Sequence, residues 1–276
     1  MPVQFGPINM STRKAHQNFR PVDGWWTPSL QKLRRAAALG ALLALVMALL
    51  PSAPAGASPA TSDMRSHVLV FGGTGRLGSE IVERLDPEEF EITVFARSSS
   101  SRDRLKGLQI NYAIGDLLDQ ESVVAALRGQ QFDYVIDASA RRNYPGRFYE
   151  IAMQNILAGL RDSEVEQFIL HGSIGAGDSA AVFSGAIYAR MRGIMADKTA
   201  AEQLLERSGM PYTIIRNGAI KVFETPATGT ARLTENTGRM GTITRPDLAV
   251  LTMQCLGEST CLNITFHAVD PSWDDE

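Results

Sequence analysis

The stretch VLVFGGTGRLG, residues 68–78, decides the fold of this chain. It begins with a continuous apolar run, Val68–Phe71, whose β-branched and aromatic side chains are typical of a strand buried on both faces of a parallel sheet. A G-x-G-x-x-G pattern follows at once, and residues 79–85 then carry apolar side chains at helical spacing. A glycine pattern that leaves a strand and opens a helix is the context in which this motif binds a dinucleotide. The stretch therefore predicts the first strand, turn and helix of a Rossmann-type fold.

The glycines of this turn have separable roles. The early glycines permit a tight turn with positive φ, Gly75 lets the backbone approach a pyrophosphate, and Gly78 lets helix and strand pack closely. The start of the helix offers free N–H groups and the positive end of a dipole to the phosphates. A glycine-rich turn without a ligand is the alternative. We expect the following residues to contact the dinucleotide: Gly72, Gly73, Thr74, Gly75, Arg76, Leu77 and Gly78.

Short apolar runs alternate with helical patterns from residue 67 to the C-terminus, which is the signature of a parallel sheet. We predict an α/β fold, a Rossmann-type doubly wound parallel sheet with helices on both faces and only a small C-terminal part to cover a substrate. Strands are expected at 68–71, 91–96, 110–114, 132–138, 167–171, 211–216 and 262–268. Helices are expected at 79–85, 120–127, 147–160, 198–208 and 245–256.

The residue that ends the second predicted strand indicates which dinucleotide binds. NAD sites usually place an acidic residue there, about 20 positions after the glycines, to bond the ribose 2′-hydroxyl. This chain has Arg97 at that place, followed by Ser98 and three further serines. A guanidinium can grip a 2′-phosphate with paired hydrogen bonds, and hydroxyl groups can complete the shell. The pattern predicts NADP(H), with NAD(H) less favoured; a solvated surface arginine is the alternative. Arg76 would add a second cation.

The ends of the third and fourth predicted strands complete the expected site, because ligands lie at the carboxyl ends of parallel strands. Asp116, with Leu117 beside it, is positioned to accept a hydrogen bond from the adenine amino group. Small residues at Ala138, Ser139 and Ala140 leave room for the nicotinamide half.

Charge and cysteine content exclude several classes of partner. Residues 1–57 hold six Lys or Arg and one acidic residue, so that the net charge of −3 leaves the rest of the chain clearly acidic. An acidic body argues against a nucleic-acid surface. No Cys or His cluster has metal-ligand spacing, and we expect no metal site. We interpret Cys255 and Cys261 as two small apolar residues, with a disulfide conceivable if the protein is exported.

The N-terminal region resembles an export signal. Basic residues precede the uncharged run AAALGALLALVMALL, residues 36–50, and an A-x-A pattern ends at Ala57. Fifteen helical residues reach roughly 22 Å, less than the roughly 30 Å hydrocarbon core of a bilayer. We therefore predict residues 1–57 as a signal peptide cleaved near Ala57, residues 58–64 as a linker and residues 65–276 as the NAD(P)-binding domain.

Other interpretations of this region stay open. The run 36–50 would anchor an uncleaved chain in a membrane, and Arg34-Arg35 before it suggests a twin-arginine address. A start at Met64 would give a complete cytoplasmic domain instead.

The motifs together resemble a known family. VLVFGGTGRLG at 68–78, FARS at 95–98 and GD at 115–116 look like atypical short-chain dehydrogenases/reductases, nearest to the NmrA-like, NAD(P)H-binding branch that includes biliverdin-IXβ/flavin reductases. The segment 208–218, SGMPYTIIRNG, is similar to that branch's SGLxYTIxRPG segment. The resemblance covers roughly Val68 to the end of the chain and implies the fold and the cofactor more specifically than the substrate.

The resemblance implies only part of the family's catalytic pattern. Short-chain dehydrogenases use a Ser, and a Tyr placed four residues before a Lys. Ser173 and Lys198 match the Ser and the Lys, but Ile194 stands at the Tyr position and Tyr188 is misplaced. The flavin-reductase branch carries a His where this chain has Ala219.

Two functions are consistent with these residues. The first is an NADPH-dependent reductase of a small conjugated acceptor such as a flavin, quinone or carbonyl, since hydride transfer to such acceptors needs little acid help. The second is a non-catalytic NAD(P)-sensing or assembly protein, which the missing Tyr favours. His171 is a second candidate proton donor, although a structural role in a core strand is preferred for it. Segments 147–160 and 198–208 could form a homodimer face.

Overall fold

The computed structural model describes residues 65–141, 146–182, 185–221, 225–235 and 240–273. Residues Ser62–Glu276 form one compact unit. The predictions for the N-terminal region, including the signal peptide, the anchor and the start at Met64, lie outside the described residues. No helix within the described ranges is long and apolar enough to cross a membrane.

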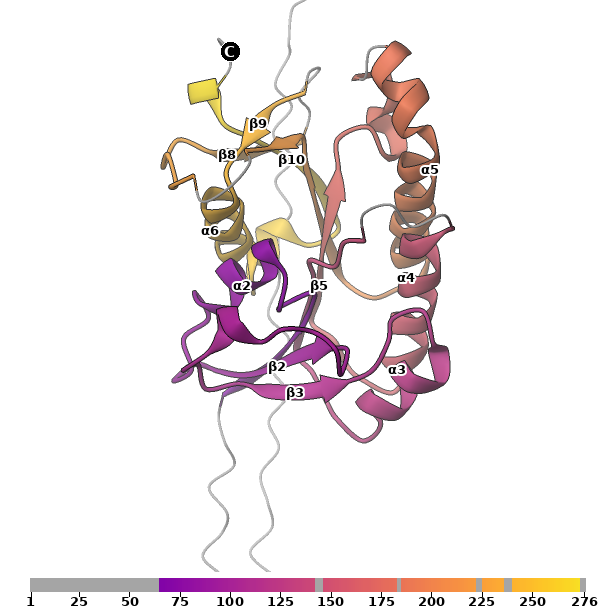
Figure 1. The fold of residues 1–276 in the computed structure, drawn as a ribbon, viewed down its shortest axis with the longest axis vertical. Coiled ribbons are helices and arrows are strands. Elements are labelled where there is room, and N and C mark those ends of the chain that lie inside the picture. Colours follow the sequence, from indigo (N-terminus) through magenta and orange to yellow (C-terminus); the bar gives the residue numbers. More distant parts are fainter. Residues whose placement is uncertain (1–64, 142–145, 183–184, 222–224, 236–239, 274–276) are drawn as a thin grey trace, which may run out of the picture. The chain divides into compact units, whose positions relative to one another are not determined.

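One large sheet organises this unit (Figure 1). Its strands follow the order β3-β2-β1-β4-β5-β6-β10-β8, and every neighbouring pair is parallel except β10 with β8. The strands are β1 (Ser66–Phe71), β2 (Phe90–Ala96), β3 (Asn111–Ile114), β4 (Tyr134–Asp137), β5 (Gln167–Ser173), β6 (Tyr212–Asn217), β8 (Arg232–Thr234) and β10 (Ile264–Val269). The chain reverses its direction of winding between β1 and β4, which creates the crevice where Rossmann folds bind ligands. A separate parallel pair consists of β7 (Ala219–Ile220) and β9 (Thr242–Ile243).

Helices cover both faces of the sheet (Figure 1). One face carries α3 (Gln120–Leu127), α4 (Phe148–Gly159) and α5 (Gly185–Arg207), whereas α2 (Arg76–Val82) and α6 (Arg245–Cys255) pack on the other. Local sequence sets several of their starts. Asp119 caps α3, and Thr244 caps α6, which has a proline in its first turn.

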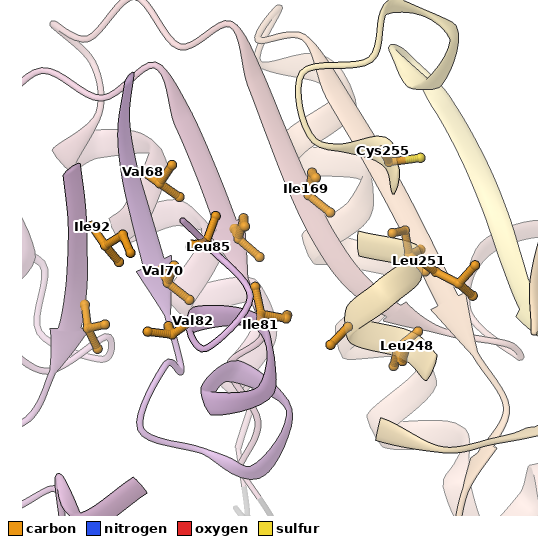
Figure 2. Close-up of a cluster of buried hydrophobic side chains, with 14 of the residues drawn as sticks. Val68, Val70, Ile81, Val82, Leu85, Ile92, Ile169, Leu248, Leu251 and Cys255 are labelled. Carbon is orange, nitrogen blue, oxygen red and sulfur yellow. The ribbon is translucent and has the colours of Figure 1, made fainter. Parts of the chain in front are cut away.

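The core divides into two apolar layers, one on each side of the sheet. Figure 2 shows the layer under α2 and α6, where Val68 and Val70 of β1 lie with Ile81, Val82 and Leu251. The opposite layer packs the alternate side chains of the same strands, such as Leu69 and Phe71, against α3, α4 and α5. All four residues of Val68–Phe71 are fully buried, as expected for a strand covered on both faces.

The structure confirms the predicted fold class, corrects the start of one helix and adds three short strands. The helix predicted at 198–208 begins at Gly185, because its first half carries exposed residues such as Arg190, Gly193 and Ile194 and so lacks an apolar face. The sequence analysis also missed β8 and the β7–β9 pair, whose two- and three-residue strands are too short to show alternation.

The cysteines form a disulfide, so interpreting them as two separate apolar side chains was wrong. Cys255 ends α6, and the chain turns back at once to bring the Cα of Cys261 within 5.6 Å. Two buried polar side chains at the start of β5 and β6 fix this loop: Gln167 donates to the carbonyl of Cys255 at 2.9 Å, and Thr213 donates to that of Cys261 at 2.7 Å. The six-residue spacing does not show that a helix ends at Cys255, so the sequence alone could not predict whether the two cysteines meet.

Candidate dinucleotide site

The glycine turn after β1 is shaped by close backbone contacts. Gly72 has a φ of +73°, and its carbonyl accepts a 2.8 Å hydrogen bond from the N–H of Gly75. A Cβ at Gly72 would lie 2.6 Å from the carbonyl oxygen of Ala138, at the end of the neighbouring strand. Only glycine combines this conformation with this approach, so the turn is a narrow backbone cradle.

The helix after the turn is pressed against it. A Cβ at Gly78 would collide with the carbonyl of Gly72, so the first turn of α2 lies directly on the backbone of the loop. Gly75 occupies the N-cap position and supplies no side chain to the first-turn amides. These N–H groups and the helix dipole together favour an anion at this place.

A pocket of about 420 Å³ opens beside the turn, at the carboxyl ends of β1 to β4. Its lining includes residues that follow four consecutive strands of the sheet, which is where a Rossmann fold holds its ligand. Nine of the predicted contacts line it: Gly72, Thr74, Gly75, Arg97, Asp116, Leu117, Ala138, Ser139 and Ala140. Ser99, Ser100 and Ser101, the three further serines expected to complete the shell of a 2′-phosphate, also line it. The sequence analysis did not name Arg141 and Phe148, which line it as well.

The structure places five predicted contacts outside the lining. Gly73 is buried against Val94 of β2, Gly78 lies beneath the turn, and Leu77 packs on the apolar core. Arg76 is exposed on the helix surface. The turn after β2, closed by a bond from the Ser100 N–H to the Arg97 carbonyl, leaves Ser98 exposed and turns the next three serines toward the pocket.

The end of the pocket formed by the loops after β2 and β3 has one cation and one acid. Arg97 is exposed and makes no ion pair within the part of the chain that the structure describes. Asp116 uses one carboxylate oxygen to accept the N–H of Leu118 at 3.0 Å, which orients the side chain at the end of β3. Arg102, farther along the same loop, instead lies 4.1 Å over the ring of Tyr112. Arg97 is thus the arginine of this loop that lines the pocket.

At the other end of the pocket, a buried carboxylate lies beside a buried hydroxyl. Asp137, the last residue of β4, is buried and accepts the N–H of Ser139 at 2.8 Å. Burial raises the pKa of Asp137. The hydroxyl of Ser139 is buried without a hydrogen-bond partner among the described residues, and Ser139 lines the pocket. A buried hydroxyl without a partner is costly unless a ligand satisfies it.

Lys198 lies on α5, where its charge interacts with that of Asp137, but it is not among the residues that line the pocket. Its ammonium lies 4.4 Å from the centre of the Tyr149 ring. Burial lowers the pKa of Lys198, while the charges of Glu202, Asp137 and Asp197 act in the opposite direction. The sequence analysis missed both Asp137 and Tyr149. A lone acid at the end of the apolar run YVID, residues 134–137, was the available signal for the first.

Ser173 and His171 lie two residues apart on β5, and neither is among the residues that line the pocket. Ser173 is the last residue of the strand, partly buried, and its carbonyl accepts the N–H of Ala176. His171 is buried and faces α6, where its Nε2 bonds the hydroxyl of Thr252 at 3.1 Å. Burial, helped by the charge of Lys198, lowers the pKa of His171 to about 3. His171 is therefore a neutral imidazole that bonds α6, which agrees with the structural role that the sequence analysis preferred for it.

The remaining expectations for the catalytic pattern concern three residues. Ile194 lies on α5 with 48% of its surface exposed and carries no proton donor. Ala219 starts β7 and is exposed. The side chain of Tyr188 falls outside the described residues.

The residues of the pocket fit a nicotinamide dinucleotide. The turn at Gly72 and Gly75 lines the pocket with backbone alone, the first-turn amides of α2 have no side-chain cap, and Ser139 offers an unpartnered hydroxyl at the far end. The match to a known family agrees with this geometry: a family described as NAD(P)H-binding matches residues 72–259.

The chain belongs to this NAD(P)H-binding family.

The family match confirms the expected NAD(P)H-binding family over residues 72–259. Photosystem II assembly factor Ycf39 of Cyanophora paradoxa is 28% identical over 153 residues, which cover 54% of this chain and 44% of that protein. Sanguinarine reductase of Eschscholzia californica is 27% identical over 200 residues, which cover 58% of this chain and 72% of that protein. The chain spans about half the length of the first curated relatives, 44% and 53%.

The fold of the NAD(P)H-binding family is also found in solved structures. ChuY, an anaerobillin reductase of Escherichia coli O157:H7, superposes with a TM-score of 0.64 at 23% sequence identity. The match covers 75% of this chain and 98% of ChuY, so nearly the whole of that fold is present here.

Proposed function

We propose that this chain is an NADPH-dependent reductase of a small conjugated acceptor, such as a flavin, a quinone or a carbonyl compound. One observation carries the proposal: a single pocket links the glycine turn and Arg97 at one end with Ser139 and Arg141 at the other. Bound reduced nicotinamide would supply a hydride, and the chain's own residues would position it against the acceptor and exclude water. The turn and α2 would hold the phosphates, and Ala138 to Ala140 would border the nicotinamide.

The preference for NADPH rests on Arg97. This guanidinium lines the pocket and has no ion-pair partner among the described residues, so it is available to a 2′-phosphate. The hydroxyls of Ser99, Ser100 and Ser101 line the same part of the pocket. NAD sites carry an acid at this place, whereas Asp116 belongs to the next strand.

Arg97→Asp tests the cofactor preference. The affinity for NADPH should fall about tenfold to a hundredfold, because one charge-assisted contact to a phosphate is removed and a repulsive charge is added. NADH binding should be unchanged or improved. Isothermal titration with each nucleotide measures both affinities. Arg104→Asp, an exposed arginine that does not line the pocket, controls for the general change in charge. Equal loss of NADPH affinity in both variants would contradict the role of Arg97.

The proposed acceptor class rests on the residue four positions before Lys198. Ile194 provides no proton donor where short-chain dehydrogenases have their Tyr, which favours acceptors that stabilise negative charge themselves. Ser173 and Lys198 remain the proposed catalytic residues at the end of β5 and on α5. Mixing the chain with NADPH and a panel of flavins, quinones and carbonyl compounds, and following nicotinamide absorbance, identifies the acceptor.

A non-catalytic role in NAD(P) sensing or assembly is the second candidate. Ile194 at the Tyr position and the similarity to an assembly factor favour it. Tight NADPH binding without oxidation by any acceptor would support this role over a reductase.

We also propose that the protein is exported and cleaved near Ala57, that its ligand is a small molecule rather than a nucleic acid, and that α4 and α5 form a homodimer face. The Cys255–Cys261 disulfide supports export, because disulfides persist in oxidising compartments. Membrane anchoring by residues 36–50 and a cytoplasmic chain beginning at Met64 are the alternatives.

A further inference from the structure

Lys198 has a tyrosine beside it, although not at the usual place in the sequence. Short-chain dehydrogenases pair this lysine with a Tyr one helical turn earlier, where this chain has Ile194. Tyr149 instead comes from α4, and its ring lies 4.4 Å from the Lys198 ammonium. A cation at this distance from an aromatic face is an attractive contact, strengthened when both groups are partly buried.

Two hydrogen bonds hold Tyr149 and Lys198 in this arrangement. The carboxylate of Asp197, adjacent to Lys198 on α5, accepts the backbone N–H groups of Tyr149 and Glu150, both at 2.9 Å. Asp197 is buried, and its negative charge lies against the amino-terminal end of α4, where the helix dipole favours it. The start of α4 is therefore fastened to the turn of α5 that carries Lys198.

The phenol of Tyr149 lies next to the pocket, directly behind residues that line it. It is hydrogen-bonded to the backbone of Arg141, which lines the pocket, as does the adjacent Phe148. Burial, together with the charges of Asp137 and Asp197, raises the pKa of Tyr149, so the phenol keeps its proton at neutral pH.

We propose that Tyr149 is the proton donor of the reaction, carried on α4 and adjacent to Lys198, in place of the tyrosine that the family carries on α5. This inference rests on the proposed reductase function. One atom of the acceptor takes the hydride, and the neighbouring oxygen or nitrogen takes the Tyr149 proton as the phenol O–H bond breaks. The resulting phenolate is stabilised by the Lys198 ammonium until solvent returns a proton.

Tyr149→Phe removes the phenol oxygen and leaves the ring under Lys198. The affinity for NADPH should stay within about twofold of the wild type, since the ring packing is kept. The kcat for a carbonyl acceptor should fall roughly 100-fold or more, the usual effect of a lost general acid. For an acceptor that needs no proton in the rate-limiting step, kcat should change little. Tyr134→Phe is the control, because that phenol bonds Glu166 outside the pocket.

A titration without any nucleotide tests the same arrangement independently. Ultraviolet absorbance of tyrosinate is followed against pH, and the difference between the wild type and Tyr149→Phe isolates the ionisation of Tyr149. Lys198→Met should move that ionisation to higher pH, because the adjacent cation is lost. Unchanged ionisation would contradict the Lys198–Tyr149 arrangement.

The outcomes separate this inference from the proposed function. An active wild type with an equally active Tyr149→Phe variant would overturn the assignment of Tyr149 and leave the reductase proposal standing. A wild type that binds NADPH but reduces no acceptor would overturn the reductase proposal itself. Loss of carbonyl reduction in Tyr149→Phe with NADPH affinity retained supports both.

Discussion

His171 makes the stability of the protein depend on pH. Its buried imidazole bonds Thr252, and burial lowers its pKa from 6.5 to about 3. Between pH 3 and pH 6.5, His171 is therefore protonated in the unfolded chain but neutral in the folded chain. The contribution of His171 to stability is complete above pH 6.5 and is lost as the pH falls toward 3.

We expect this residue to remove about 2 kcal/mol of unfolding free energy between pH 6.5 and pH 5. Urea denaturation at a series of pH values measures it. His171→Gln, which retains a polar side chain facing Thr252, should flatten the pH profile in this window. An equally steep profile in that variant would show that other groups cause the loss.

Sequence could predict the residues of the site that lie within one strand–turn unit. Gly72, Gly75 and Arg97 each follow a recognisable strand, and the structure places all three on the pocket. Tyr149 could not be found this way, because its partner Lys198 is far along the chain and joins it only when α4 packs on α5.

Among the elements, α5 is tied to the sheet by a buried ion pair. Arg216, near the end of β6, donates to the Glu202 carboxylate at 2.8 and 3.2 Å, and both side chains are buried. Arg216 also pairs with Asp178, whose side chain is 91% exposed. Taking one partner from a buried pair leaves the other charge without compensation.

Glu202→Gln should therefore cost about 3 kcal/mol of unfolding free energy. Asp178→Asn, which breaks the exposed contact to the same arginine, should cost less than about 1 kcal/mol. Chemical denaturation of the two variants under identical conditions gives the comparison. Equal losses of unfolding free energy in the two variants would mean that burial does not determine how much these ion pairs stabilise the protein.

The elements themselves differ in how far sequence predicts them. The core strands and α3 follow apolar patterns and are found within two residues of their predicted ends. The sequence pattern did not predict the first half of α5, because an exposed helix has no apolar face. It did not predict β8, because three residues are too few to show an alternating pattern. The disulfide could not be predicted, because it forms only where the chain turns back after α6, and no local sequence pattern indicates that turn.

For the whole molecule, one mass measurement tests export and oxidation together. The intact mass of the protein purified from its native compartment should correspond to a chain that begins near Ser58. It should also lie two hydrogen masses below the reduced form, because Cys255 and Cys261 are joined. Mass after reduction is the control.

A chain that retains residues 36–50 would contradict cleavage and favour a membrane anchor. A chain that begins at Met64 with both thiols reduced would favour the cytoplasmic alternative, since reducing compartments keep cysteines free.

The two edge strands of the large sheet affect how readily the protein self-associates. β3 and β8, the two outermost strands, are only four and three residues long, and β8 begins at the exposed Arg232. Unpaired backbone groups along a sheet edge are templates on which further chains add, and short, charged edges provide few of them. Concentrated solutions of the folded domain should accordingly not form fibrils by pairing at the edge strands of the native sheet. On heating, precipitation should begin only after the hydrophobic core has unfolded.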